Sequence, residues 1–136
     1  MAGPNYGLDK GFEAAGAIRQ YRCVELSAIE TVTECNGVND VVLGICQDEV
    51  SAADATNKRV ADIRISGISR AIAGGTITPT TNGGRCTVDA QGRVVAAPVA
   101  VGTLYPQVGF VLQACVVGDH VDVVLTPGVV SNTAVS

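Results

Sequence analysis

Aromatic and imidazole side chains are scarce in this sequence. Its 136 residues include no Trp, three Tyr, two Phe and one His. Sugar-binding sites usually stack ligand rings on exposed aromatic side chains, so this scarcity argues against a carbohydrate-binding module. A general base needs a reacting group and usually an orienting partner within hydrogen-bond reach. The only histidine, His120, lies in a predicted turn between Asp119 and Val121, where a surface role is expected.

Signatures of catalysis and of metal binding are also missing. There is no phosphate-binding G-x-x-x-x-G-K-[ST] loop, no G-x-S-x-G elbow and no H-E-x-x-H helix. Two carboxylate pairs, Asp48 with Glu49 and Asp54 with Asp62, lie in polar segments where solvated acids are expected. The sequence therefore predicts a protein that is not an enzyme, with no catalytic residue, no metal site and no cofactor.

The charge pattern and the short apolar runs exclude two further classes. The formal net charge is −4 and no run of Lys or Arg offsets it, so a nucleic-acid partner is not expected. Apolar stretches such as Gly109–Val117 fall far short of the roughly 20 residues of a membrane helix. The first residues show no basic segment followed by an apolar one, as a signal peptide would. We expect folding in the cytoplasm, without a membrane partner.

The five cysteines are odd in number and widely spaced, with no C-x-x-C among them. Common zinc sites take pairs of ligands from short loops, which this spacing does not provide. Unpaired cysteines are among the most buried residues in proteins. We therefore expect Cys23, Cys35, Cys46, Cys86 and Cys115 to be mainly small buried hydrophobic side chains.

Valine and glycine dominate what is present, and this composition favours β-structure. Residues 61–66 alternate strictly, with Ala61, Ile63 and Ile65 on one face, and Gly67 then predicts a bulge or bend because Ile68 breaks the alternation. Further strands are predicted at 18–26, 31–33 and 41–46, with a loop or a short helical turn at 51–58. Hairpins are predicted at 86–96 and 108–126. The fold class is all-β: a compact small barrel or β-tulip, or a sandwich.

Three segments are predicted along the chain. Residues 1–16 show no sustained periodicity and form either a frayed end or an arm that orders against a neighbour, with Tyr6, Leu8 and Phe12 as its anchors. Residues 17–126 form the β-domain. Residues 127–136, which begin with Pro127-Gly128, form a flexible tail.

The order of landmarks between residues 17 and 126 resembles a family of capsid decoration (cement) proteins of tailed bacteriophages. The resemblance rests on Leu43-Gly44-Ile45, a strand that ends at Gly67, Ala73-Gly74-Gly75, the Asp89–Val94 segment, and the apolar pair of strands around Gly118-Asp119. Family members often carry Gly-Asp where this chain has Asn57-Lys58, which puts the shape of that loop in question.

The resemblance implies a virion protein on the capsid exterior that stabilises contacts between capsomers. Its partners would be the major capsid protein and two further copies in a homotrimer, and an N-terminal arm would add to a strand of the capsid protein. A receptor- or carbohydrate-binding β-module of a phage tail or fibre is the alternative, and an enzyme using Asp and His120 is a distant third.

Overall fold

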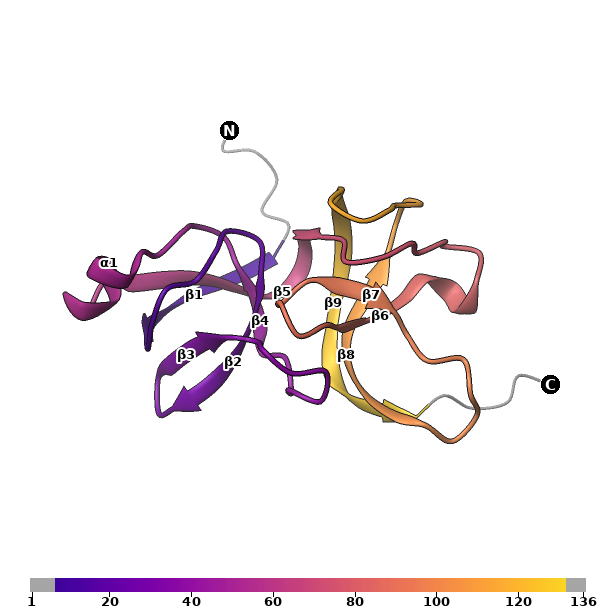
Figure 1. The fold of residues 1–136 in the computed structure, drawn as a ribbon, viewed down its shortest axis with the longest axis horizontal. Helices are drawn as coiled ribbons and strands as arrows, with labels where there is room; N and C mark the ends of the chain where they lie inside the picture. The colour runs from indigo at the N-terminus through magenta and orange to yellow at the C-terminus, as the bar shows by residue number, and fades with distance from the viewer. Residues whose placement is uncertain (1–6, 132–136) are drawn as a thin grey trace.

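One long strand, β5 (Val60–Ile72), joins the two halves of the molecule. Its first part pairs with β1 (Gly7–Ala14) and β4 (Gly44–Cys46), and its second part pairs with β9 (His120–Ser131). Figure 1 shows the halves side by side, with β1–β4 in one and β6–β9 in the other. The computed structural model describes residues 7–131, and within this range nine strands form one sheet in the order β1-β3-β2-β4-β5-β9-β8-β6-β7. The all-β prediction is confirmed.

The N-terminal half of the sheet curls into a ring. Strand β2 (Cys23–Ala28) pairs with β3 (Thr31–Glu34) and with β4, and β1 pairs with both β3 and β5. Side chains that point inward from these strands form a buried apolar cluster. The cluster comprises Phe12, Ala14, Ile18, Val24, Val32, Cys46, Val50, Ala61 and Ile63. The sheet is thus partly closed into a ring and is not a complete barrel.

The polar segment before β5 forms the short helix α1 (Ala52–Thr56). The Ser51 hydroxyl accepts a hydrogen bond from the Asp54 N–H at 3.1 Å, and the Asp54 carboxylate accepts one from the Ser51 N–H at 3.2 Å. This reciprocal capping box satisfies N–H groups that the first helical turn leaves unpaired. Of the two alternatives that the sequence left open here, the helical turn is therefore correct.

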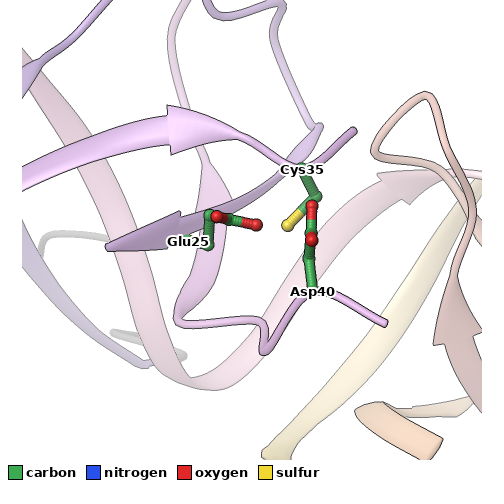
Figure 2. A group of neighbouring side chains, drawn as sticks. All are labelled: Glu25, Cys35 and Asp40. Carbon is green, nitrogen blue, oxygen red and sulfur yellow. The ribbon is translucent and has the colours of Figure 1, made fainter. Parts of the chain in front are cut away.

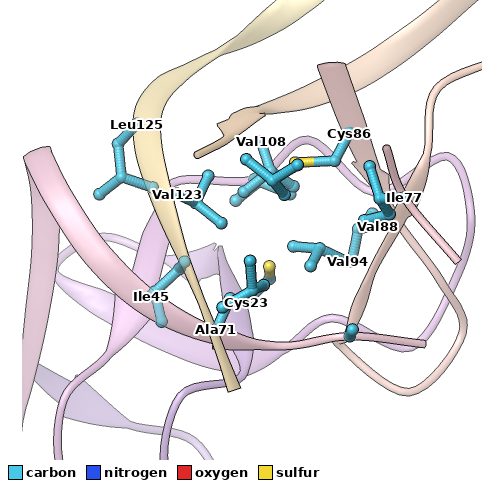
Figure 3. Close-up of a cluster of buried hydrophobic side chains, with 14 of the residues drawn as sticks. Cys23, Ile45, Ala71, Ile77, Cys86, Val88, Val94, Val108, Val123 and Leu125 are labelled. Atoms are coloured by element: carbon cyan, nitrogen blue, oxygen red, sulfur yellow. The ribbon is translucent and has the colours of Figure 1, made fainter. Parts of the chain in front are cut away.

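The C-terminal half is built from two hairpins. A 3-10 turn (Asn82–Gly84) leads into β6 (Arg85–Val88), which pairs with β7 (Val94–Ala96), and β8 (Leu104–Val111) pairs with β9. Both hairpins were predicted. Their inward side chains meet those of β2, β4 and β5 in a second apolar cluster (Figure 3), which includes Cys23, Ile45, Ala71, Ile77, Cys86, Val88, Val94, Val108, Val123 and Leu125.

The bend predicted at Gly67 marks the place where β5 changes partners. Gly67 has a φ of 90°, a conformation that glycine adopts at little cost, and from this residue onward β5 pairs with β9. The predicted change of phase is wrong, however. Ser69 and Ala71 are buried whereas Ile68 is only half-buried, so the odd-numbered residues face inward on both sides of the bend. The pairing of β5 with β9 therefore decides which side chains face inward, and the hydrophobicity of Ile68 does not.

Two predicted strands are shorter than expected. The strand predicted at 18–26 begins only at Cys23, because Tyr21 has a φ of 62° and interrupts the extended backbone. Ile18 instead forms an isolated bridge with Val50 and is fully buried. The strand predicted at 41–46 is reduced to Gly44–Cys46. Between β8 and β9 the chain runs through a longer connection than a Gly-Asp turn, and Cys115 in it bridges to Ile77.

The predicted terminal segments need correction where the structure describes them. Residues 7–14 are not a separate arm, because β1 pairs with β5 from Gly7 to Glu13 and with β3 at its end. Residues 127–131 are not a loose tail, because β9 continues to Ser131 opposite Leu104. Backbone hydrogen bonds to neighbouring strands outweigh the weak local pattern in both places. Neither helix in residues 7–131 is long or apolar enough to cross a membrane.

Candidate functional site

The three residues expected to anchor an N-terminal arm have different environments. Tyr6 lies outside the described residues. Leu8 lies on β1 opposite Ser66 and its side chain is 59% exposed, so it is available to a partner. Phe12 is only 7% exposed and belongs to the apolar cluster of the N-terminal half, with the Lys10 amine 4.6 Å from its ring centre. Phe12 therefore completes the core of its own domain and cannot anchor the chain to another protein.

The polar residues considered for catalysis have structural contacts. His120 is exposed at the start of β9 and its ring meets that of Tyr21 edge-on, with the ring centres 5.6 Å apart. Asp48 forms an ion pair with Arg59 at 3.0 Å and accepts a hydrogen bond from the Asp62 N–H at 3.2 Å. Asp54 caps α1. The structure thus brings Asp48 and Asp62 together, but places neither beside His120 in a shared hydrogen bond.

The five cysteines are all unpaired and buried, as the sequence predicted. Burial raises the pKa of the Cys46 and Cys86 thiols to about 12. A thiol with such a pKa is protonated at neutral pH and is a poor nucleophile. Four of the cysteines, Cys23, Cys35, Cys86 and Cys115, belong to the larger apolar cluster.

Cys35 has a different setting, because two carboxyl groups face it. Glu25 on β2, Cys35 just after β3 and Asp40 in the following loop converge on one point (Figure 2), and their sulfur and carboxylate ligand atoms all lie within 4.8 Å of one another. The N–H groups of Asn36 and Gly37 each donate to Asp40 Oδ2 at 2.9 Å, which fixes the loop. We call Glu25, Cys35 and Asp40 the acidic thiol cluster.

Electrostatics in the acidic thiol cluster are dominated by like charges. A hydrogen bond with Asp40, together with partial burial, raises the pKa of Glu25 to about 7. The same hydrogen bond from Glu25 and those from the loop N–H groups lower the pKa of Asp40. Burial, and then the negative charges of Glu25 and Asp40, raise the pKa of the Cys35 thiol. At neutral pH the two carboxyl groups share a proton unless a cation neutralises them.

A shallow hollow lies at the junction of the two halves. It has a volume of about 480 Å³ and is lined by Tyr21, Gln47, Arg64, Ile68, Arg70, Leu112 and Asp122. Arg64 is held by Asp9 at 2.7 Å, and the Arg70 guanidinium lies 5.8 Å from the centre of the Tyr21 ring. The Tyr21 ring therefore already contacts Arg70 and His120 of the same chain.

Charged residues are distributed very unevenly between the two halves. No Asp, Glu, Lys or Arg occurs in residues 94–118 or after Asp122, so most of β7, β8 and β9 and the loops between them carry no formal charge. Large hydrophobic side chains are nevertheless exposed in this region. Those more than half exposed are Val99, Val101, Leu104, Val116, Val117 and Val129.

This uncharged region ends in a two-stranded ribbon whose β9 edge has no partner strand among the described residues. Residues 127–131 of β9 pair only with β8 among the described residues, since pairing with β5 stops at Leu125. Leu104 lies opposite Ser131 and Pro106 opposite Val129, so Leu104 and Val129 lie on the same face. We call residues 104–107 and 127–131, with the adjoining Val99 and Val101, the ribbon end. A hollow of about 390 Å³ beside it is lined partly by Phe110 and Val130.

Sequence reasoning missed both the acidic thiol cluster and the ribbon end. The cluster has no sequence signature, because Glu25, Cys35 and Asp40 are irregularly spaced and meet only through the pairing of β2 with β3 and the return of the loop. The ribbon end had a detectable signal, since a count of charges along the chain shows the uncharged stretches directly.

Comparisons with known proteins give a likeness in fold. No protein-family model matches the chain, and no curated protein matches its sequence. Among solved structures, the crystal structure of the N base of the head fibre protein gp8.5 of bacteriophage phi29 matches with a TM-score of 0.59. The match covers 88% of this chain and 93% of that chain, at 14% sequence identity. The chain therefore has a fold similar to that of the base of a phage head fibre.

Proposed function

We propose that this protein is a structural component of a bacteriophage head, which attaches to the outer surface of the shell as a decoration protein. The observation that carries the proposal is the likeness over nearly the whole of both chains to a domain described as the base of a head fibre. The resemblance of the sequence to capsid decoration proteins supports the same location independently. A fold alone does not specify a function. The proposal therefore also needs an attachment surface and an experiment that tests it.

We assign attachment to the ribbon end. Natural sheets protect open edges with charged side chains, prolines or covering segments. The described part of β1 follows this rule, because Asp9 and Lys10 form ion pairs there with Arg64 and Glu30. The ribbon end has Pro127 at the start of its β9 segment but no charge, and it exposes Leu104 and Val129 at 69% and 57%. An open edge with apolar side chains suits a strand of the major capsid protein, which would pair with β9 through its backbone.

Three matched substitutions test the function and the surface together. Leu104→Glu places a charge on the ribbon end. Leu26→Glu and Leu8→Glu place one on β2 and on β1. All three leucines are about half exposed or more. Each purified protein is mixed with phage heads that lack it, and the protein that co-sediments with the heads is quantified. We expect the wild type and Leu26→Glu to bind in stoichiometric amounts and Leu104→Glu to lose at least about tenfold in affinity.

The outcomes separate the parts of the proposal. Failure of the wild-type protein to bind any head would overturn the function. Binding that is lost in Leu8→Glu and kept in Leu104→Glu would move the attachment surface to β1, where the sequence placed it. The expected homotrimer is tested on the same samples by light scattering coupled to gel filtration, where a monomer mass would contradict it.

The alternative function, a receptor- or carbohydrate-binding module, has weaker support. The Tyr21 ring is half-buried and is already contacted by Arg70 and His120, so it offers no free face to a sugar. Screening the isolated protein against a glycan array tests this alternative. Specific binding that is lost in Tyr21→Ala would favour it over a capsid role.

A further inference from the structure

We infer that Glu25, Cys35 and Asp40 form a binding site for a divalent transition-metal ion of the zinc type. The inference is independent of the proposed role on the phage head. It revises the expectation from cysteine spacing that the chain has no metal site, because the three residues come from β2, from the position just after β3 and from the loop that follows. That arrangement is visible only in the tertiary structure.

Among the described residues, the ligand atoms have no donor other than the proton that Glu25 and Asp40 share. The Cys35 side chain is fully buried, forms no hydrogen bond, and points its sulfur between the two carboxyl groups (Figure 2). Glu25 Oε2 is buried, and when both carboxyl groups are ionised no described group donates a hydrogen bond to it. Asp40 uses Oδ2 for both loop N–H groups, which leaves Oδ1 for an ion. A buried acceptor without a donor is costly, and a cation removes that cost.

Among the described residues, no basic side chain forms an ion pair with these groups. Neither Glu25 nor Asp40 takes part in an ion pair among the described residues, although seven such pairs occur elsewhere in the same part of the chain. The nearby Glu34 adds negative charge and is itself paired with Arg19. One thiol and two carboxyl groups therefore face one another with only protons to offset their charge.

The donor set selects the class of ion. A thiolate with two carboxylates suits a borderline-soft ion such as Zn²⁺ or Co²⁺ and does not suit Mg²⁺ or Ca²⁺, which prefer oxygen ligands alone. Metal bonds of about 2.3 Å to sulfur and about 2.1 Å to oxygen place tetrahedral ligand atoms about 3.5 Å apart. The present separations extend to as much as 4.8 Å, so the ligand atoms would have to move closer together to bind an ion. A water molecule or a partner's side chain would fill the fourth position.

Binding would release the protons that now occupy the cluster. The Cys35 thiol loses its proton to form the metal–sulfur bond, and the proton shared by Glu25 and Asp40 leaves as both carboxylates bind. No change of oxidation state is involved. The ion would tie the 36–43 loop to β2 and β3, and so fasten the connection between β3 and β4.

Cobalt serves as the probe, because thiolate ligation gives Co²⁺ a charge-transfer band in the near ultraviolet. The full chain is reduced, stripped with a chelator, desalted without oxygen and titrated with Co²⁺. We expect a saturable band at one equivalent that Zn²⁺ abolishes. Cys35→Ser should lose the band, whereas the matched control Cys115→Ser, at a buried cysteine outside the cluster, should keep it.

Two further variants keep the test valid if Cys35→Ser fails to fold. Glu25→Gln and Asp40→Asn alter partly exposed side chains, and each should weaken Co²⁺ binding at least about tenfold. Zn²⁺ should raise the melting temperature of the wild type and not of these variants. Absence of the band in the folded wild type would overturn the inference and leave a proton-sharing carboxyl pair. A band that survives in Cys35→Ser, or an unchanged affinity in both carboxyl variants, would overturn it equally.

Discussion

Substitution of Phe12 by alanine tests whether the first described strand belongs to the domain core or is a detachable arm. Phe12 is 7% exposed and packs in the smaller apolar cluster, which holds few other large side chains. Removing a buried Phe side chain costs about 3–5 kcal/mol, since the cavity that it leaves closes only in part. Domains of this kind are stable by about 5–15 kcal/mol in total. The variant should therefore fold but lose a large share of its stability.

Urea unfolding followed by circular dichroism measures this loss. With a denaturant dependence of about 2 kcal/mol per molar, a loss of about 4 kcal/mol lowers the unfolding midpoint by about 2 M. The corresponding decrease in melting temperature is about 12 °C, at about 3 °C per kcal/mol for a chain of this size.

Leu8→Ala is the matched control for Phe12→Ala on the same strand. Its side chain is 59% exposed, so the unfolding free energy should change by less than about 0.5 kcal/mol. If Phe12→Ala were no more destabilising than Leu8→Ala, then β1 would contribute little to the core. The prediction that residues 7–14 form an arm would then be supported.

Three further predictions follow from close packing, proton sharing and thiol burial. Gly109→Ala should lower the unfolding free energy by about 1–3 kcal/mol, because a Cβ at Gly109 overlaps the Val124 carbonyl oxygen. Gly16→Ala should be neutral, because a Cβ there has no atom of the described residues within 4 Å, and equal urea midpoints for the two variants would contradict this. The hydrogen bond with Asp40 raises the pKa of Glu25 from 4.5 to about 7 in the folded state, so metal-free protein binds more protons folded than unfolded in that range. Its unfolding free energy should fall as the pH rises from 4.5 to 7, and a profile unchanged in Glu25→Gln would refute the assignment. All five buried thiols should react with a chromogenic disulfide only after unfolding, and one fast-reacting thiol in the folded protein would disagree.

Local pattern is enough to predict several elements of this fold. The alternation of Ala61, Ile63 and Ile65 predicts a strand with one buried face, and the structure confirms it, because a period of two leaves few other ways to bury those side chains. The 86–96 hairpin is found for a similar reason, since Gly92 supplies the positive φ that its turn requires. Burial of the cysteines follows from their chemistry and spacing.

Local pattern fails where distant strands supply the decisive interactions. The segment around Phe12 has no clear periodicity. It nevertheless forms β1, because it pairs with the backbone of β5 and because the Phe12 side chain packs in the apolar cluster inside the ring of strands. The same holds for Val129, whose strand extends past Pro127 because β8 pairs with it. In both places the hydrogen bonds come from residues far away in the sequence.

By itself, the sequence determined the β-character of the chain, most of its turns and the burial of its cysteines, because residue type and short-range periodicity are sufficient for these. Only the tertiary structure decided which edges are paired, that Phe12 is a core residue, and that Glu25, Cys35 and Asp40 meet. Those features depend on strand order and on the closure of a ring, and pairing between segments tens of residues apart leaves no trace in a local pattern.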